Sequence, residues 1–131
     1  MQSFRRLEVW RRAHAHALNV RRATRTFPRH GYSRLKAQLI GAAESIPFNI
    51  VEGCGCDSNK EFARFLGISI KSSMELEGEL QMARDNGIMK STEWRHLTDE
   101  TVEIRRMLWG LRKRVIASSD PRNDLSESHT D

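Results

Sequence analysis

The sequence is poor in the features that stabilise secreted and membrane proteins. Only two cysteines occur among 131 residues, too few for a disulfide framework. No apolar run approaches the ~18–20 residues that a membrane-crossing helix requires. No hydrophobic signal core follows the first residues of the chain. We therefore expect one domain in the cytoplasm, with reduced cysteines and no membrane partner.

Motifs for common chemistry are also missing. The chain has no Gly-rich phosphate loop, no Ser/His/Asp or Cys/His set with a known catalytic spacing, and no metal motif. Cys54 and Cys56 alone cannot supply the four ligands of a tetrahedral zinc site, unless a ring-shaped oligomer pools cysteines from neighbouring copies. His14 and His16 face different ways on a helix and are not a metal pair. The sequence therefore predicts no enzyme, no cofactor and no bound metal.

Charge is abundant and unevenly distributed. Of the residues, 30% are charged and the net charge is +5. Residues 1–40 hold ten Lys or Arg and one acid, Glu8, which gives +9, whereas residues 41–131 hold 12 bases and 16 acids, which gives −4. Such a block is typical either of a solvated charged surface or of a basic field directed at a polyanion. Base content alone does not identify the ligand.

Apolar periodicity predicts four helices. Their expected bounds are Leu7–Thr26, Ser33–Gly53, Asn59–Asn86 and Ser91–Ala117. The connections around 27–33, 53–58 and 87–91 are short, so sequential helices should be antiparallel neighbours. We expect an all-α, antiparallel, up-down-up-down four-helix bundle over residues 1–117. The polar segment 118–131 has no period and is expected to be a disordered tail.

Several local signals refine this prediction. Ser33 is a good N-cap, Gly53 is typical of a helix end, and Ser58 with Glu61 forms a capping box. The apolar stripe expected on the first helix comprises Leu7, Trp10, His14, Ala17, Arg21 and Thr24, with Ala13, Leu18 and Val20 beside it. His14 is therefore predicted to lie at the edge of the core with a satisfied hydrogen bond. The stripe on the second helix comprises Leu35, Leu39, Ala42, Ala43, Ile46 and Ile50, and that on the third Phe62, Phe65, Leu66, Ser69, Ser73, Leu76, Leu80 and Ala83.

The fourth helix carries two apolar stripes. The first has spacings of three and four, as expected for the core of a bundle: Trp94, Leu97, Thr101, Ile104, Leu108, Leu111 and Val115. The second repeats every seven residues and consists of Val102, Trp109 and Ile116. Because a helix in a monomeric bundle needs one stripe, the second predicts contact with another copy of the chain.

The basic first helix contains the candidate nucleic-acid contacts. At ~100° per residue, Arg11, Arg22 and Arg25 lie on one flank, and Arg12 points further round as a possible fourth contact. Guanidinium groups suit phosphate because their donors form a planar fork. The competing interpretation is that these arginines solvate the bundle or pair with Glu residues of neighbouring helices.

Motifs spread along the chain resemble those of a known family. They are Leu7, Val9 and Trp10; Phe27 and Pro28; Ser45, Ile46, Asn49, Ile50, Glu52 and Gly53; Ser58, Lys60, Glu61, Phe62, Arg64, Phe65 and Leu66; and Ser73, Glu75, Leu76 and Glu77. Together they resemble the bacterial four-helix-bundle proteins, which are also called 23S rRNA intervening-sequence or S23-like proteins. The chain departs from this pattern at Cys54–Asp57, where relatives usually carry Gly and Arg.

The resemblance implies a four-helix bundle and a homo-oligomeric ring of five. The family is also similar to the accessory proteins of diversity-generating retroelements, which bind a reverse transcriptase and RNA. Two functions therefore remain open. One is a non-enzymatic oligomer that binds structured RNA, or DNA, through phosphate contacts of the first helix. The other is a scaffold that docks an acidic protein partner, such as a nucleic-acid enzyme.

Overall fold

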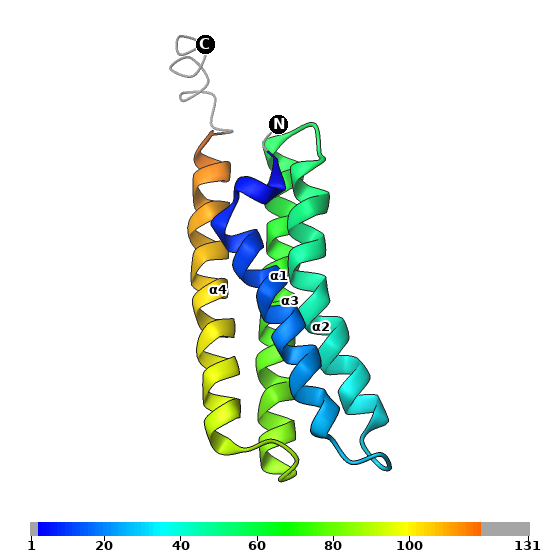
Figure 1. Ribbon diagram of the computed structural model, residues 1–131. Helices are drawn as coiled ribbons and strands as arrows, with labels where there is room; N and C mark the ends of the chain where they lie inside the picture. The colour runs from blue at the N-terminus through cyan, green and yellow to red at the C-terminus, as the bar shows by residue number, and fades with distance from the viewer. Residues whose placement is uncertain (1–2, 119–131) are drawn as a thin grey trace.

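The computed structural model describes residues 3–118 and contains four α-helices joined by short connections (Figure 1). The 3-10 helix η1 (Phe4–Arg6) precedes α1 (Glu8–Ala23), and the 3-10 helix η2 (Thr24–Thr26) follows it. The other helices are α2 (Ser33–Cys54), α3 (Asn59–Asp85) and α4 (Ser91–Ser118). No strand occurs among the described residues, which confirms the all-α class.

The helix boundaries agree with the sequence signals except at a few termini. Helix α1 ends at Ala23, before the predicted Thr26, because the chain tightens into η2 and the Thr24 hydroxyl donates to the Arg21 carbonyl at 2.7 Å. Ser33 is the first residue of α2 and not its N-cap. Of the predicted tail 118–131, Ser118 closes α4, and residues 119–131 lie outside the described residues.

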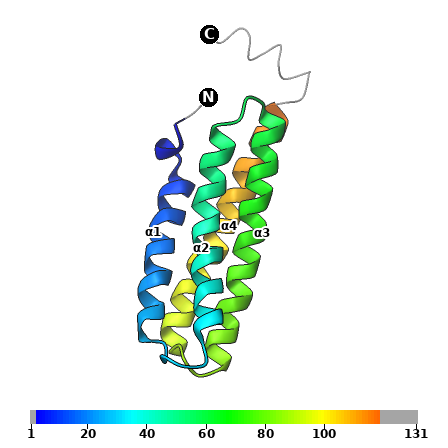
Figure 2. The ribbon, with the colours of Figure 1, turned by 90° about the vertical axis from the view of Figure 1, so that its right-hand side faces the viewer.

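The helices pack side by side around one core. Helix α1 contacts α2 and α4, and α3 contacts the same two helices from the far side of the view in Figure 1. The α1–α2 and α3–α4 connections lie at one end of the molecule, and the loop between α2 and α3 lies at the other (Figures 1 and 2). Residues far apart in the sequence therefore meet at both ends.

The core stripes predicted for α2, α3 and α4 are largely confirmed. The fully buried large side chains include Leu39, Ile46, Ile50, Leu66, Leu76, Leu80, Ile104 and Leu108. Full burial of one such side chain contributes about 1.5–3 kcal/mol. Leu35, Phe62, Phe65 and Trp94, at the edges of these stripes, are only partly buried. In the described part of the chain, no helix has the length and apolarity required to cross a bilayer.

The stripe predicted for α1 is wrong in part. The buried face of α1 consists of Val9, Ala13, His16, Ala17, Val20 and Ala23. Trp10 is only partly buried, and Arg21 and His14 are exposed. His14 stacks on the Trp10 ring with 4.9 Å between centroids, so the histidine in the core is His16. Because α1 has few large apolar residues, the sequence alone did not determine which of its faces is buried.

Gly53 does not end α2, contrary to the prediction. The helix continues to Cys54, and Gly53 is buried where α2 and α3 approach each other. A Cβ atom built on Gly53 would lie 2.7 Å from Cδ1 of Phe62 and 3.2 Å from Cβ of Phe65. The glycine is therefore required for close helix packing. The predicted capping at Ser58 is confirmed on one side, since its hydroxyl accepts from the Glu61 amide at 3.1 Å.

Candidate nucleic-acid interface

The exposed flank of α1 and η2 presents three arginines. Arg11, Arg22 and Arg25 are all exposed. Arg11 Nη1 donates to the Arg5 carbonyl oxygen at 2.7 Å, and Arg22 Nη1 donates to Asn19 Oδ1 at 3.0 Å. Among the described residues, none of the three forms an ion pair. Their positive charge is therefore not neutralised within the described part of the chain.

Arg12 lies in different surroundings. Its Nη2 contacts Glu100 Oε1 at 2.5 Å, and its Nε donates to Glu100 Oε2 at 3.1 Å. This forked pair joins α1 to α4 and is one of the stronger hydrogen-bonding geometries in proteins. The hydrogen bond to Glu100 raises the pKa of Arg12. Because Nη1 also contacts Met107 Sδ at 3.7 Å, all three guanidinium nitrogens have partners, and Arg12 contributes to packing between helices.

Arg21 is also paired, and this divides the arginines of α1 into two groups. Its Nη2 lies 3.1 Å from Glu44 Oε2 of α2. Arg12 and Arg21 thus face the two neighbouring helices, while Arg11, Arg22 and Arg25 face away from both acids. Of the competing interpretation of the sequence, pairing with Glu holds for Arg12 and does not occur for Arg11, Arg22 and Arg25 among the described residues. Its other half, solvation of the bundle by these three arginines, is not tested by the structure.

A buried hydrogen-bond network fixes the orientation of α1 against α4. His16 Nε2 lies 2.8 Å from Thr101 Oγ1, and the Thr101 hydroxyl donates to the Leu97 carbonyl at 2.8 Å. Because a threonine hydroxyl has one proton, His16 Nε2 must be the donor, which defines the neutral tautomer. Burial lowers the pKa of His16 to about 4. The ring is therefore neutral at physiological pH and is a packing group, not a ligand for anions.

The second stripe of α4, defined above as Val102, Trp109 and Ile116, is partly at the surface, since Val102 is only partly exposed. Trp109 is 54% exposed and Ile116 is 45% exposed. An open hollow of about 400 Å³ lies beside these two side chains and is also lined by Gly110, Arg112 and Lys113. Next to the stripe, Arg105 pairs with Glu77 at 2.6 Å, and Arg112 Nε donates to the Ala63 carbonyl at 3.0 Å. These contacts tie α4 to α3 and leave the tryptophan outside.

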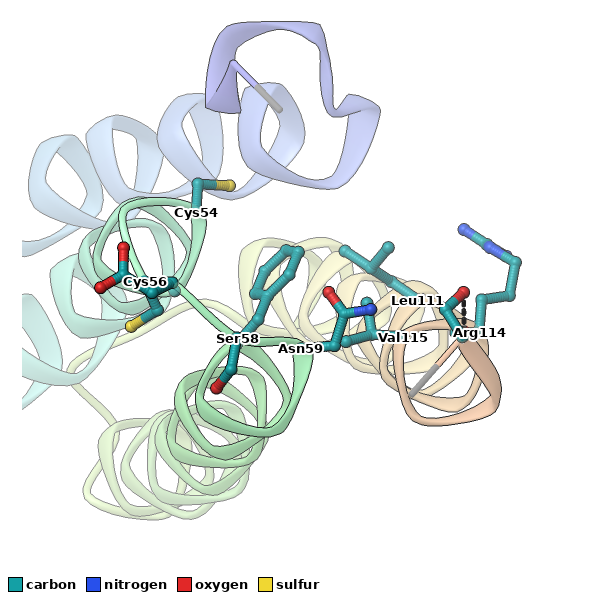
Figure 3. A pocket seen from close by; sticks show the side chains of 11 residues that line it. Cys54, Cys56, Ser58, Asn59, Leu111, Arg114 and Val115 are labelled. Carbon is teal, nitrogen blue, oxygen red and sulfur yellow. Dashed lines mark hydrogen bonds between the residues drawn. The ribbon is translucent and has the colours of Figure 1, made fainter. Parts of the chain in front are cut away.

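The loop with the two cysteines borders a larger hollow of about 590 Å³, between the α2–α3 loop and the end of α4 (Figure 3). Cys54 and Cys56 point to opposite sides of this loop. Cys54 is buried, which raises the pKa of its thiol, and the Cys56 thiol donates to the Glu52 carbonyl at 3.4 Å. Within the described residues, no group of three or more His, Cys, Asp or Glu is placed to hold a metal.

One charged cluster was not identified from the sequence. Arg84 of α3 and Arg95 of α4 both lie over the Trp94 ring, with 4.4 Å and 5.8 Å between guanidinium carbon and ring centroid. The sequence places Trp94 in the core stripe and Arg95 beside it, but Arg84 reaches the ring only because the α3–α4 connection folds back. A sequence signal for this cluster does exist. Arg84 precedes the short α3–α4 connection, and Trp94 and Arg95 follow it.

The sequence pattern of the 23S rRNA-intervening sequence protein family matches residues 5–110. The chain belongs to this family. A crystal structure of a protein with unknown function, from the S23 ribosomal protein family of Bacteroides thetaiotaomicron, superposes with a TM-score of 0.72 at 19% sequence identity. The alignment covers 80% of this chain and 98% of the other, which supports the fold alone. No curated protein matches the chain.

Proposed function

We propose that this member of the 23S rRNA-intervening sequence family is a non-enzymatic protein that binds structured RNA through the phosphate backbone. The observation that carries the proposal is the exposed set Arg11, Arg22 and Arg25, which lacks acidic partners among the described residues. The family name links these proteins to intervening sequences of rRNA, which favours RNA over other polyanions.

The chemistry of the three arginines suits phosphate contacts with little dependence on base sequence. Each guanidinium offers several donors in one plane, which match two phosphate oxygens at once. Phosphate contacts position a nucleic acid without specifying its sequence. Aromatic residues make up 7% of the chain, and Trp10 and Trp94 are already covered by His14 and by arginines. Phe48 and Trp109 are exposed but lie on α2 and α4, so the α1 flank itself favours backbone binding over stacking with unpaired bases.

We further propose that the bundle has the up-down-up-down order and assembles into a homo-oligomeric ring, with five copies as the family resemblance implies. A heterologous interface that closes requires two different patches on each copy. The α4 stripe supplies one patch. Phe48 of α2, which is 63% exposed, lies on another helix and is the candidate centre of the second. A ring would repeat the basic flank of α1 around its axis, so weak contacts would add by avidity.

The test is to replace Arg11, Arg22 and Arg25 together by Gln and titrate a structured RNA at several salt concentrations. For the wild type, about 3–4 neutralised phosphates per subunit contact give a slope of log affinity against log salt near −3. The variant is expected to bind at least about tenfold more weakly, with a slope shallower by about 2–3. Folding and oligomer mass are checked first by circular dichroism and light scattering.

A matched control removes the same charge elsewhere. Arg64, Lys71 and Arg106 are exposed on α3 and α4, and two of them pair with Glu61 and Glu103. Their triple change to Gln should leave the salt slope close to that of the wild type. Equal behaviour of the two triple variants would mean that net charge, not the α1 flank, determines binding.

The second candidate function is a scaffold that docks an acidic protein, such as a reverse transcriptase or another nucleic-acid enzyme. The exposed Trp109 and the adjacent Arg112 and Lys113 favour it, because apolar and basic groups together suit an acidic protein surface. If the wild-type protein binds neither structured RNA nor duplex DNA at low salt, the scaffold function replaces the RNA-binding function as the proposal.

A further inference from the structure

The end of the bundle that contains two helix connections is strongly basic. Residues 24–34 cover the α1–α2 connection and the start of α2, residues 84–95 cover the end of α3, the α3–α4 connection and the first turn of α4, and both segments lie at the same end (Figures 1 and 2). Six cations occur in these segments, Arg25, Arg29, Arg34, Arg84, Lys90 and Arg95, against two acids, Asp85 and Glu93. All six cations are exposed. The positive charge at this end is thus contributed by both halves of the sequence.

Trp94 orders two of these cations. The Arg84 guanidinium lies 4.4 Å and the Arg95 guanidinium 5.8 Å from the ring centroid. A guanidinium over an indole face is attracted by the ring and loses part of its rotational freedom before any ligand binds. Neither arginine forms an ion pair within the described part of the chain. Their in-plane donors therefore remain available for an anion.

The two acids at this end do not neutralise the cluster. Asp85 accepts a hydrogen bond from Gln81 Nε2 at 3.0 Å, one turn earlier on α3. Glu93 is exposed and forms no ion pair with a described residue. An uncompensated excess of four positive charges therefore faces outward from the end of the bundle.

The surface at this end is also open to a large ligand. The connections turn at Gly31 and Gly87, whose φ angles of 94° and 75° favour glycine. A Cβ atom built on either residue would have no neighbour within 4 Å. The basic flank of α1 runs to the same end, because Arg22 and Arg25 belong to the last turn of α1 and to η2. The two basic surfaces therefore adjoin.

We propose that this connection end, centred on Arg84, Trp94 and Arg95, is a second phosphate-contacting surface that extends the α1 flank onto the end of the bundle. The inference rests on the proposed RNA-binding function and adds a site to it. Arg84 and Arg95 contact the phosphates, and Trp94 is a positioning residue that holds them. The same RNA backbone bends from the α1 flank across the connection end, so Arg84 and Arg95 make the wild-type salt slope steeper than the value of about −3 expected for the α1 flank alone.

The experiment compares Arg84→Gln/Arg95→Gln with Arg64→Gln/Arg106→Gln in titrations of the full chain with structured RNA. Both double variants remove two exposed positive charges, but the control pair lies on the sides of α3 and α4 and is engaged by Glu61 and Glu103. The connection-end variant should bind about tenfold more weakly, with a salt slope shallower by about 1.4–1.8. The control should keep the wild-type slope. Melting followed by circular dichroism verifies folding of all variants.

A charge-retaining variant separates electrostatics from structure. Arg84→Lys/Arg95→Lys should recover most of the salt slope but only part of the affinity, because lysine lacks the planar fork. One outcome would overturn the connection-end site and leave the RNA-binding proposal standing. In it, the Arg11, Arg22 and Arg25 variant loses RNA affinity, but Arg84→Gln/Arg95→Gln keeps the wild-type salt slope. No RNA affinity in the wild type would overturn both proposals. Equal losses in the two double variants would also overturn the connection-end site.

Discussion

At the scale of single residues, two histidines on α1 occupy opposite environments. His14 is exposed on Trp10, whereas His16 is buried and donates to Thr101. Burial lowers the pKa of His16 to about 4, below the usual value of 6.5. Burial, aided by Glu75, raises the pKa of Glu79 to about 7, above its usual 4.5. The two groups therefore affect stability in opposite directions between pH 4 and 7.

We predict that His16 makes the bundle less stable as the pH falls from about 6.5 towards 4. In this window the unfolded chain binds a proton at His16 and the folded chain does not, so stability rises with pH. The contribution lost between pH 7 and pH 5 is on the order of 1–2 kcal/mol. Glu79 offsets part of this loss in the wild type. Urea unfolding of the wild type and of His16→Gln is therefore compared at both pH values, because Glu79 is present in both proteins and the difference isolates His16.

The His16→Gln variant should be less stable than the wild type at pH 7, and the difference should shrink at pH 5. His14→Gln is the matched control, because this exposed histidine lies on the same helix. A stability difference for His16→Gln that does not change with pH would contradict a neutral buried ring.

At the scale of elements, the α2–α3 contact depends on close approach of two backbones. Ser69 Oγ donates to the Ile46 carbonyl at 2.8 Å, and the hydroxyls of Ser45 and Ser72 lie 2.7 Å apart. Near the loop, Gly53 leaves space for the Phe62 ring. Small side chains along the α2–α3 contact let the two backbones approach closely enough for hydrogen bonds between the helices.

We predict that Gly53→Ala destabilises the protein by about 1–3 kcal/mol, because the added methyl overpacks a buried contact 2.7 Å from Phe62. Gly78 on α3 is the control. Its built Cβ meets no atom within 4 Å, so Gly78→Ala should stabilise the helix by about 0.5–1 kcal/mol. Urea unfolding of both variants measures the difference, and an increase in stability for Gly53→Ala would show that Phe62 moves aside without cost.

At the scale of the whole molecule, the exposed apolar residues bear on assembly. Among the described residues, the exposed large hydrophobic side chains are Phe48, Met74, Met82, Trp109, Ile116 and Leu18. Trp109 and Ile116 line a common hollow on α4. An aromatic residue beside a hollow with basic edges has the composition of a protein interface more than that of a solvated surface.

We predict that Trp109→Glu lowers the oligomer mass, because a charged side chain replaces the indole in the apolar contact between copies and loses solvation there. Light scattering coupled to size-exclusion chromatography measures the mass. Met82→Glu, which changes a side chain of similar exposure on α3, is expected to keep the wild-type mass. A monomeric wild type, or an unchanged mass for Trp109→Glu, would remove the α4 stripe as an interface.

The sequence alone determined the number of helices, most of their boundaries and the buried faces of α2, α3 and α4. These helices contain enough large apolar residues for the period to select one face. Helix α1 relies on alanines and a histidine, so several faces were nearly equivalent and the choice of His14 over His16 was wrong. The local signal for a helix start at Ser58 was reliable because capping involves neighbours in the chain, whereas Ser33 proved to be the first residue of α2 and not its N-cap.

Only the tertiary structure decided which charges are neutralised. Arg12 and Glu100 are 88 residues apart, and no local pattern distinguishes Arg12 from Arg11 as the paired arginine. Gly53 likewise reads as a helix end in sequence, because the Phe62 ring that requires its missing side chain arrives from the next helix. Arg84 and Trp94 meet across a connection for the same reason. Periodicity fixes which face of a helix is buried, but pairing of charges and contacts between backbones depend on distances that exist only once the helices pack.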